Sequence, residues 1–160
     1  MRTGSPIHVL GLDAGGTKTV CLLADEHGAI LSTARRGGAN LQAAGELEVE
    51  KVLHDVMEEA LEGIDVAPAA ICLGIAGVDR PDDFAVVRGI MRRIGHKTRI
   101  VVVNDALIAL EAGAPGEPGV VIISGTGSIA YGRNAGGVAA RSGGWGYVLR
   151  RRTRSPTRGS

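Results

Sequence analysis

Over residues 7–113, strand-like apolar segments and segments with a helical hydrophobic period follow one another in a definite order. This order restricts the chain to very few folds. Three short apolar segments come first, at residues 7–13, 19–25 and 29–34, and tight turns separate them. The chain then alternates between amphipathic segments with a helical period and continuous apolar runs. Because short apolar runs bounded by turns are typical of strands, the sequence predicts the order β-β-β-α-β-α-β-α.

Two predicted helices carry clear signals. Residues 44–64 place one apolar stripe on a helix that is otherwise strongly charged: Leu53, Met57, Ala60, Leu61 and Ile64. The next helix opens at Pro81, has Arg92 and Arg93 in its last turn, and is followed by Gly95. Proline at the first position, cations at the end and a glycine cap are what the helix dipole and backbone geometry favour.

The later strands are predicted to be parallel and buried. Residues 69–76 and 100–103 are continuous apolar runs, which is typical of strands covered on both faces. A short helix is expected at residues 105–113. Three meander strands followed by parallel strands joined through helices fit an α/β domain of the ribonuclease-H-like kind. We assign this domain to residues 1–113.

A second run of strands repeats the opening pattern. After a glycine- and proline-rich loop, strands are expected at residues 120–124, 128–133 and 138–141. The similarity to the first meander is topological. It predicts that residues 114–149 form the incomplete start of a second domain of the same kind.

Composition excludes several classes of protein. Residues 1–149 carry 13 basic and 17 acidic side chains, a net charge of −4, because five of the 18 basic residues lie after residue 149. This charge argues against a nucleic-acid-binding surface. No apolar run is long enough for a membrane span, so a cytoplasmic protein is expected. Cys21 and Cys72 lie within apolar stretches and are interpreted as small buried residues.

Two turns rich in glycine and hydroxyl side chains are candidate phosphate-binding loops. The first lies in GLDAGGTKT, residues 11–19, and the second in ISGTGS, residues 123–128. The first is not a P-loop, since it lacks the Gly-Lys-Ser/Thr order, and it joins two strands. Taken alone, each is better explained as a simple hairpin turn. Two such turns in matching places can hold a polyphosphate through backbone amides.

Two carboxylates and a glycine lie at the carboxyl ends of the predicted parallel strands. Asp13 ends the first strand, Asp105 follows the strand at 100–103, and Gly77 follows the strand at 69–76. If these strands are parallel, all three residues meet at the edge where open α/β sheets bind ligands. A structural alternative for Asp105 is that it is the N-cap of the following helix.

Five motifs in order resemble the BadF/BadG/BcrA/BcrD ATPase family, and most closely its N-acetylglucosamine kinase and glucosamine kinase branch. They are DAGGTKT (13–19), GIAGVDRP (74–81), VVVNDA (101–106), VIISGTGSIAYG (121–132) and GGWGY (143–147). The resemblance covers residues 7–149 and implies that the ribonuclease-H-like domain is an actin-like ATPase domain. It implies ATP-dependent phosphorylation of an amino sugar, with ATP and Mg²⁺ as cofactors, and it allows dimerisation of full-length members.

The resemblance also implies roles for individual residues. Asp13 would hold Mg²⁺, and Asp105 would be the general base and contact the sugar. The ATP phosphates would be bound by Gly15, Gly16, Thr17 and Lys18 in the first loop, and by Ser124, Gly125, Thr126, Gly127 and Ser128 in the second. The sugar would also be contacted by Asn40, Gly144, Trp145 and Gly146.

The chain departs from the family pattern after Leu149. The family continues with a Gly-Asp-Glu-Gly-Ser segment, whereas residues 150–160 contain five arginines and no apolar residue. We expect residues 150–160 to be disordered and out of frame, or alternatively a genuine basic tail that binds nucleic acid or an acidic partner. A truncated chain of this kind is expected to have little or no kinase activity.

Alternative functions remain open from the sequence. An ATPase that activates acyl-CoA dehydratases would need cysteines in a Gly-Cys-Gly setting, and neither Cys21 nor Cys72 has one. A ROK-type sugar kinase shares the DxGGTK and NDA patterns but carries a cysteine-rich zinc motif, and none follows Ser128. A non-catalytic sugar- or phosphate-binding fragment is the remaining alternative.

Overall fold

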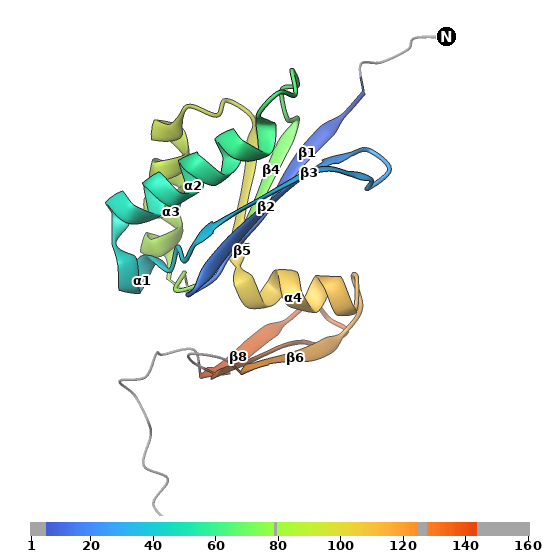
Figure 1. Ribbon diagram of the computed structural model, residues 1–160. Helices are drawn as coiled ribbons and strands as arrows, with labels where there is room; N and C mark the ends of the chain where they lie inside the picture. The colour runs from blue at the N-terminus through green and yellow to red at the C-terminus, as the bar shows by residue number, and fades with distance from the viewer. Residues whose placement is uncertain (1–5, 79, 125–127, 144–160) are drawn as a thin grey trace, which may run out of the picture.

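The computed structural model describes residues 6–78, 80–124 and 128–143, which form two β-sheets with a helix between them (Figure 1). The larger sheet has five strands in the order β3-β2-β1-β4-β5. The smaller sheet has three strands in the order β6-β7-β8. Residues 150–160, for which we predicted disorder, lie outside the described residues.

The five-stranded sheet has the predicted topology. Its strands are β1 (His8–Ala14), β2 (Lys18–Asp25), β3 (Ile30–Gly37), β4 (Ala70–Ile75) and β5 (Arg99–Asn104). The first three form an antiparallel meander. β4 is parallel to β1, and β5 is parallel to β4. The α/β, ribonuclease-H-like fold class expected from the sequence is therefore confirmed.

Two long helices cover one face of this sheet (Figure 1). They are α2 (Glu46–Leu61) and α3 (Pro81–Ile94), and a short helix α1 (Leu41–Ala44) precedes α2. The core lies between these helices and the sheet, and its largest fully buried side chains include Leu10, Leu23, Leu53, Met57, Ile71, Leu73, Ile90 and Met91. In the described part of the chain, no helix is long and apolar enough to cross a membrane.

The ends of α3 follow the predicted capping pattern. Pro81 is its first residue, and the backbone N–H of Arg80 donates to the side chain of Asp83. Gly95 follows the helix in the left-handed conformation, with φ of 99°. Because this region of φ favours glycine, Gly95 determines where α3 ends.

The opposite face of the sheet is less covered than the sequence predicts. Cys72 in β4 and Val101 in β5 are exposed, so the expectations that both strands are buried on both faces, and that Cys72 is buried, are wrong. The reason is that only α4 (Asp105–Gly113) packs on this face among the described elements. Cys21 on the covered face is buried, and burial raises the pKa of its thiol to about 12.

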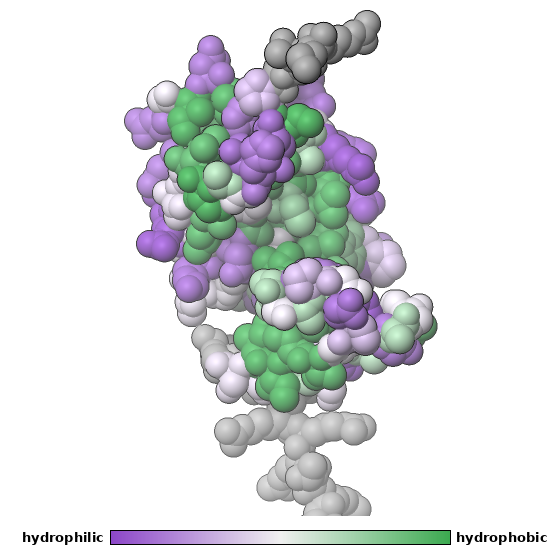
Figure 2. Space-filling view, turned by 90° about the vertical axis from the view of Figure 1, so that its right-hand side faces the viewer, coloured by the Kyte–Doolittle hydropathy of each residue, from purple (hydrophilic) through white to green (hydrophobic). Residues whose placement is uncertain are grey.

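The three-stranded sheet repeats the antiparallel meander. It consists of β6 (Gly119–Ser124), β7 (Ser128–Arg133) and β8 (Ala139–Gly143), and α4 contacts β6 and β7 on one face. On its outer side Val120 and Ile122 are 72% and 74% exposed. Figure 2 shows this area as an apolar surface in the lower part of the molecule. The outer face of β6 is therefore apolar and exposed among the described residues.

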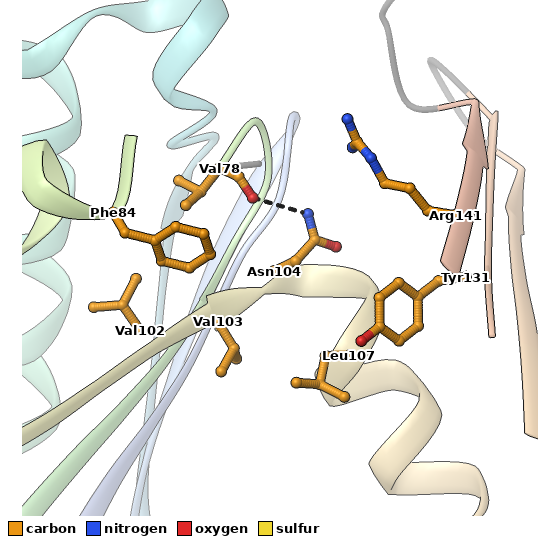
Figure 3. A pocket seen from close by; sticks show the side chains of 8 residues that line it. All are labelled: Val78, Phe84, Val102, Val103, Asn104, Leu107, Tyr131 and Arg141. Atoms are coloured by element: carbon orange, nitrogen blue, oxygen red, sulfur yellow. Dashed lines mark hydrogen bonds between the residues drawn. The ribbon is translucent and has the colours of Figure 1, made fainter. Parts of the chain in front are cut away.

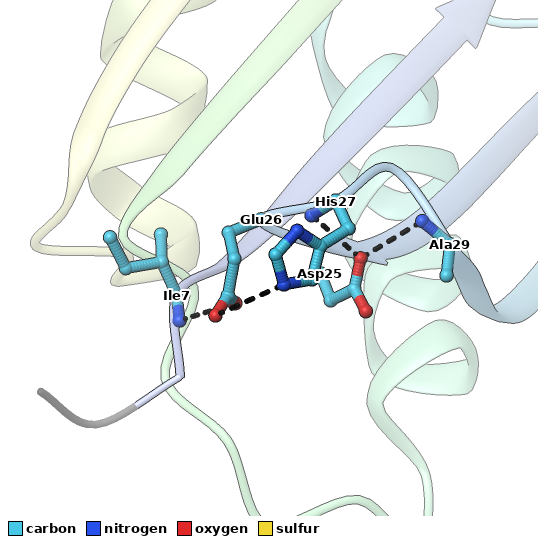
Figure 4. A network of polar contacts seen from close by, with 5 residues as sticks. All are labelled: Ile7, Asp25, Glu26, His27 and Ala29. Carbon is cyan, nitrogen blue, oxygen red and sulfur yellow. Dashed lines mark hydrogen bonds and ion pairs between the residues drawn. The ribbon is translucent and has the colours of Figure 1, made fainter. Parts of the chain in front are cut away.

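The turn between β2 and β3 is organised by one carboxylate (Figure 4). Asp25 accepts hydrogen bonds from the backbone amides of His27 and Ala29, both at 2.9 Å. These bonds, that from Ala29 first, lower the pKa of the Asp25 carboxyl. Next to it, Glu26 accepts from the backbone amide of Ile7 at 3.0 Å. Asp25 therefore stabilises the β2–β3 turn, and Glu26 holds Ile7, the residue that precedes β1.

Glu111 in α4 connects the helix to the second sheet and to the loop between them. Its carboxylate forms an ion pair with Arg133 of β7 and accepts from the backbone amide of Gly116 at 2.8 Å. Arg133 also donates to the backbone carbonyl of Glu117 at 2.8 Å. The amide of Gly116 and the Arg133 guanidinium lower the pKa of the Glu111 carboxyl. This cluster stabilises α4 against the second sheet.

Replacing Glu111 by glutamine should lower the stability of the chain at neutral pH. The pKa of this carboxyl is lower in the folded than in the unfolded state, so its contribution is present above the unfolded value of about 4.3 and is lost as pH falls through the folded value. Urea unfolding of wild type and Glu111→Gln should therefore differ at pH 7, and the difference should shrink as pH falls below about 4.3. Glu117→Gln is the control, because Glu117 contributes only its backbone carbonyl to the cluster. A difference that does not shrink at any acidic pH at which the chain stays folded would contradict this account.

Candidate active site

The carboxyl ends of the three parallel strands lie side by side at one edge of the larger sheet. In the register of the sheet, Asp13 lies opposite Gly74, and Gly74 lies opposite Val103. Asp13 and Val103 are therefore two strand spacings apart, about 10 Å. Asp105 begins α4 two residues after Val103. The structure thus brings Asp13, Gly77 and Asp105 to one edge, as the parallel arrangement predicts.

Asp13 points away from the main core. Its neighbours Leu12 and Ala14 are buried beneath the helices, whereas Asp13 is exposed on the face on which α4 packs. No cluster of three or more metal-ligating side chains occurs among the described residues. A single exposed carboxylate fits Mg²⁺ nevertheless, because this ion is commonly held by one or two carboxylates together with substrate phosphates and water.

The first glycine loop is a tight exposed turn between β1 and β2. The backbone amide of Gly15 donates to the carbonyl of Lys18 at 2.9 Å, which closes the turn. A side chain on Gly16 would meet no atom within 4 Å, so the backbone there borders open space. Gly16, Thr17 and Lys18 are exposed. Bare backbone amides in such a turn can bind phosphate oxygens.

The second glycine loop is described only at its two ends. Ser124 and Ser128 are exposed and lie opposite each other where β6 and β7 meet. The candidate phosphate ligands Gly125, Thr126 and Gly127 lie outside the described residues. The candidate sugar ligands Gly144, Trp145 and Gly146 also lie outside them.

Asn40 is held in place by two neighbouring segments. It is the N-cap of α1, and its Oδ1 accepts from the backbone amides of Gln42 and Ala43 at 3.0 and 3.1 Å. A Cβ on Gly77, whose φ is 79°, would lie 2.7 Å from this Oδ1. The close approach explains the glycine in the GIAG segment. Since Oδ1 is used by the cap, the Nδ2 group is the part of Asn40 that can donate to a ligand.

Gln42 is a residue of this edge that the sequence analysis missed. Its Nε2 donates to the carbonyl of Gly77 at 3.3 Å and to Asp83 at 3.1 Å. It therefore connects the segment after β3 to the loop after β4 and to the start of α3. Its position two residues after Asn40 in GGANLQ is the signal that could have identified it.

Asp105 is the first residue of α4, and the structure corrects the alternative interpretation of its role. The N-cap is Asn104, whose Oδ1 accepts from the backbone amide of Ala106 at 2.9 Å. The Nδ2 of Asn104 donates to the carbonyl of Val78 at 3.2 Å. The N-cap is therefore Asn104, and the half-buried carboxylate of Asp105 beside it also accepts from the backbone amide of Ala106, at 2.9 Å.

A pocket of about 280 Å³ lies between the end of β5 and the second sheet (Figure 3). Val78, Phe84 and Asn104 line it on one side, and Tyr131 and Arg141 on the other. In Figure 3 the side chain of Arg141 extends from the second sheet toward Asn104, and the ring of Tyr131 extends toward Leu107. Sequence analysis missed both residues, because Tyr131 fits a strand pattern and Arg141 lies just outside the GGWGY motif. The pocket places two polar groups of the second sheet next to the edge that carries Asp105.

Comparison with known proteins identifies the family. The model of the BadF/BadG/BcrA/BcrD ATPase family matches residues 10–150. The chain belongs to this family. ATP use is a property of this family as a whole. The matched residues include both glycine loops and both candidate carboxylates.

Within the BadF/BadG/BcrA/BcrD ATPase family, the chain is similar to curated amino-sugar kinases. It is 39% identical over 145 residues to N-acetylmuramic acid/N-acetylglucosamine kinase of Clostridium acetobutylicum, covering 89% of this chain and 47% of the relative. It is 36% identical over 152 residues to N-acetyl-D-glucosamine kinase of Dictyostelium discoideum, covering 88% and 48%. The chain thus spans about half the length of these relatives.

A solved structure shows the same fold. A protein of Chromobacterium violaceum, provisionally assigned as an N-acetylglucosamine kinase, superposes with a TM-score of 0.75 at 28% identity. The superposition covers 88% of this chain and 50% of that one. The described sheets and helices therefore match about half of a larger kinase-like structure.

Proposed function

We propose that this chain supplies the phosphate-loop half of an ATP-dependent kinase that phosphorylates N-acetylglucosamine or a related amino sugar. The observation that carries the proposal is the position of Asp105. It lies at the carboxyl edge of the sheet, level with the glycine loop of β1 and with Asn40, in a chain 39% identical to a curated amino-sugar kinase. The N-cap is Asn104, and the Asp105 carboxylate lies beside it at this edge, where it also accepts from the backbone amide of Ala106 at 2.9 Å.

In this proposal, each residue at this edge has a different role in phosphoryl transfer. The amides of the loop containing Gly15, Gly16 and Thr17 hold the phosphates, and Lys18 adds positive charge. Asp13 would hold Mg²⁺, which neutralises phosphate charge when it is bound. The carboxylate of Asp105 accepts the proton of the attacking sugar hydroxyl. Positioning and charge neutralisation are the main requirements of this reaction.

The sugar is proposed to lie between Asn40 and Asp105. The Nδ2 group of Asn40 would donate to a sugar oxygen, and its Oδ1 stays in the α1 cap. Gly144, Trp145 and Gly146 are proposed as further sugar contacts on the strength of the family resemblance. Gly125, Thr126 and Gly127, with Ser124 and Ser128 beside them, are proposed as the second phosphate loop on the same basis.

The proposal is tested by nucleotide binding to the 160-residue chain. Titration calorimetry should show binding of ATP that depends on Mg²⁺, and Asp13→Ala should weaken it by about tenfold or more, as loss of a metal-holding group does. Asp65→Ala is the matched control, because Asp65 is an exposed aspartate that precedes β4 at the opposite end of the sheet. Equal ATP affinity in wild type and Asp13→Ala would contradict the role of Asp13.

A further inference from the structure

Gly38, just after β3, lies against the backbone of the first glycine loop. A Cβ on Gly38 would be 2.2 Å from the carbonyl oxygen of Gly16, 2.6 Å from its carbonyl carbon and 2.9 Å from the amide nitrogen of Thr17. All three atoms belong to the backbone of the loop and cannot rotate away as a side chain would. Any side chain larger than hydrogen at position 38 must therefore move the loop or the segment after β3.

A hydrogen bond joins the same two segments. The backbone amide of Ala39, a fully buried residue, donates to the carbonyl of Gly15 at 3.0 Å. Together with the bond from Gly15 to Lys18, it fixes the orientation of the first peptide of the loop. The loop is thus held from one side by its own turn and from the other by Gly38 and Ala39.

We propose that Gly38 is a positioning residue for nucleotide phosphates, acting through the backbone of Gly16 and Thr17; this inference rests on the proposed function. The amides of a phosphate loop bind only if they are aimed at the phosphate oxygens, within the narrow range of hydrogen-bond distances. The contact with Gly38 determines the direction in which these amides point. Asn40 lies two residues further on and caps α1, so the same segment sets the distance between the phosphate loop and the proposed sugar contact.

The chain offers a closely matched control for this inference. Gly37 is the preceding residue and the last of β3, and a Cβ there would meet no atom within 4 Å. Gly37→Ala and Gly38→Ala change the same residue type in the same way at adjacent positions. Only the second substitution places a methyl group against the loop.

The test measures ATP affinity and loop structure in the 160-residue chain. With ATP and Mg²⁺ as the probe, Gly38→Ala should bind about tenfold to a hundredfold more weakly, since a displacement of about 1 Å costs this much in a positioned site. Gly37→Ala should bind as wild type does. In NMR spectra, the amide signals of Gly16 and Thr17 should shift in Gly38→Ala and not in Gly37→Ala.

Hydrogen exchange in the wild-type chain provides a second test that needs no substitution. Binding of ATP should slow exchange of the Ala39 amide, because phosphates bound to the loop make opening of its bond to Gly15 rarer. The amide of Ala29, at the far turn of the same sheet, should exchange at an unchanged rate. Equal ATP affinity in wild type and Gly38→Ala, or unchanged Ala39 exchange on ATP binding, would overturn the role of Gly38 while leaving the proposed function in place. Absence of ATP binding to the wild type would overturn both.

Discussion

Replacing Asp105 by asparagine should reduce phosphorylation of an amino sugar by a factor of about 10²–10⁴, the usual contribution of a general base. The amide keeps the shape of the side chain, and its oxygen can still accept from the backbone amide of Ala106 as the carboxylate does at 2.9 Å. It cannot accept the proton of the sugar hydroxyl. ATP affinity should therefore remain close to that of the wild type, and the loss should appear in kcat.

The assay requires a chain that matches the whole length of the relatives. Residues 1–149 joined to the part of the Clostridium acetobutylicum relative that lies outside the matched region form such a chimaera, since the two sequences are 39% identical over the 145 matched residues. Asp82→Asn is the control, because Asp82 occupies the first turn of the neighbouring helix α3 and loses the same charge. If Asp105→Asn retained most of the turnover, Asp105 would serve only to stabilise the start of α4.

Replacing Gly74 by valine should lower the free energy of unfolding by about 1–3 kcal/mol, the usual cost of overpacking. A Cβ on Gly74 would lie 2.5 Å from Cδ1 and 2.8 Å from Cγ1 of Ile108, so α4 packs directly on the strand at this glycine. The added side chain must push Ile108 and its helix away from β4. Urea unfolding of the 160-residue chain measures the effect.

Gly11→Val is the matched control for Gly74→Val. Gly11 lies in the neighbouring strand on the same face of the sheet, and a Cβ there would meet no atom within 4 Å. Because valine also favours strands, this variant should be as stable as the wild type or more stable. Equal destabilisation by both substitutions would show that the loss comes from the strand and not from the contact with α4.

Local chemistry explains which parts of the fold could be predicted. Hydrophobic periodicity and turn residues predict the meander and the parallel strands, and caps such as Pro81 and Gly95 predict the ends of α3. All of these signals lie in residues that are close together in the sequence. The exposure of Cys72 and Val101 could not be predicted in this way. An apolar run shows that a strand can be buried on both faces, and only the arrangement of the helices decides whether it is.

Some features of the candidate site could likewise be predicted from local sequence, and others could not. Asp13, Asp105 and the first glycine loop could be placed at one edge because parallel strands align their carboxyl ends. The division of roles between Asn104 and Asp105 required side-chain geometry, since either residue can cap a helix. The contacts of Gly38, Arg141 and Tyr131 join segments far apart in the sequence, and no local pattern marks them.

Transfer of phosphate from ATP to N-acetylglucosamine by the chimaeric chain is the most direct test of the proposed function. We expect sugar phosphate and ADP in equal amounts at an ordinary enzyme rate, about 1 s⁻¹ or faster. Formation of both products should require the sugar, and Asp105→Asn should slow it by a factor of about 10²–10⁴. Release of ADP at the same rate with and without sugar, with no sugar phosphate formed, would contradict the assignment of this edge as an amino-sugar phosphorylation site.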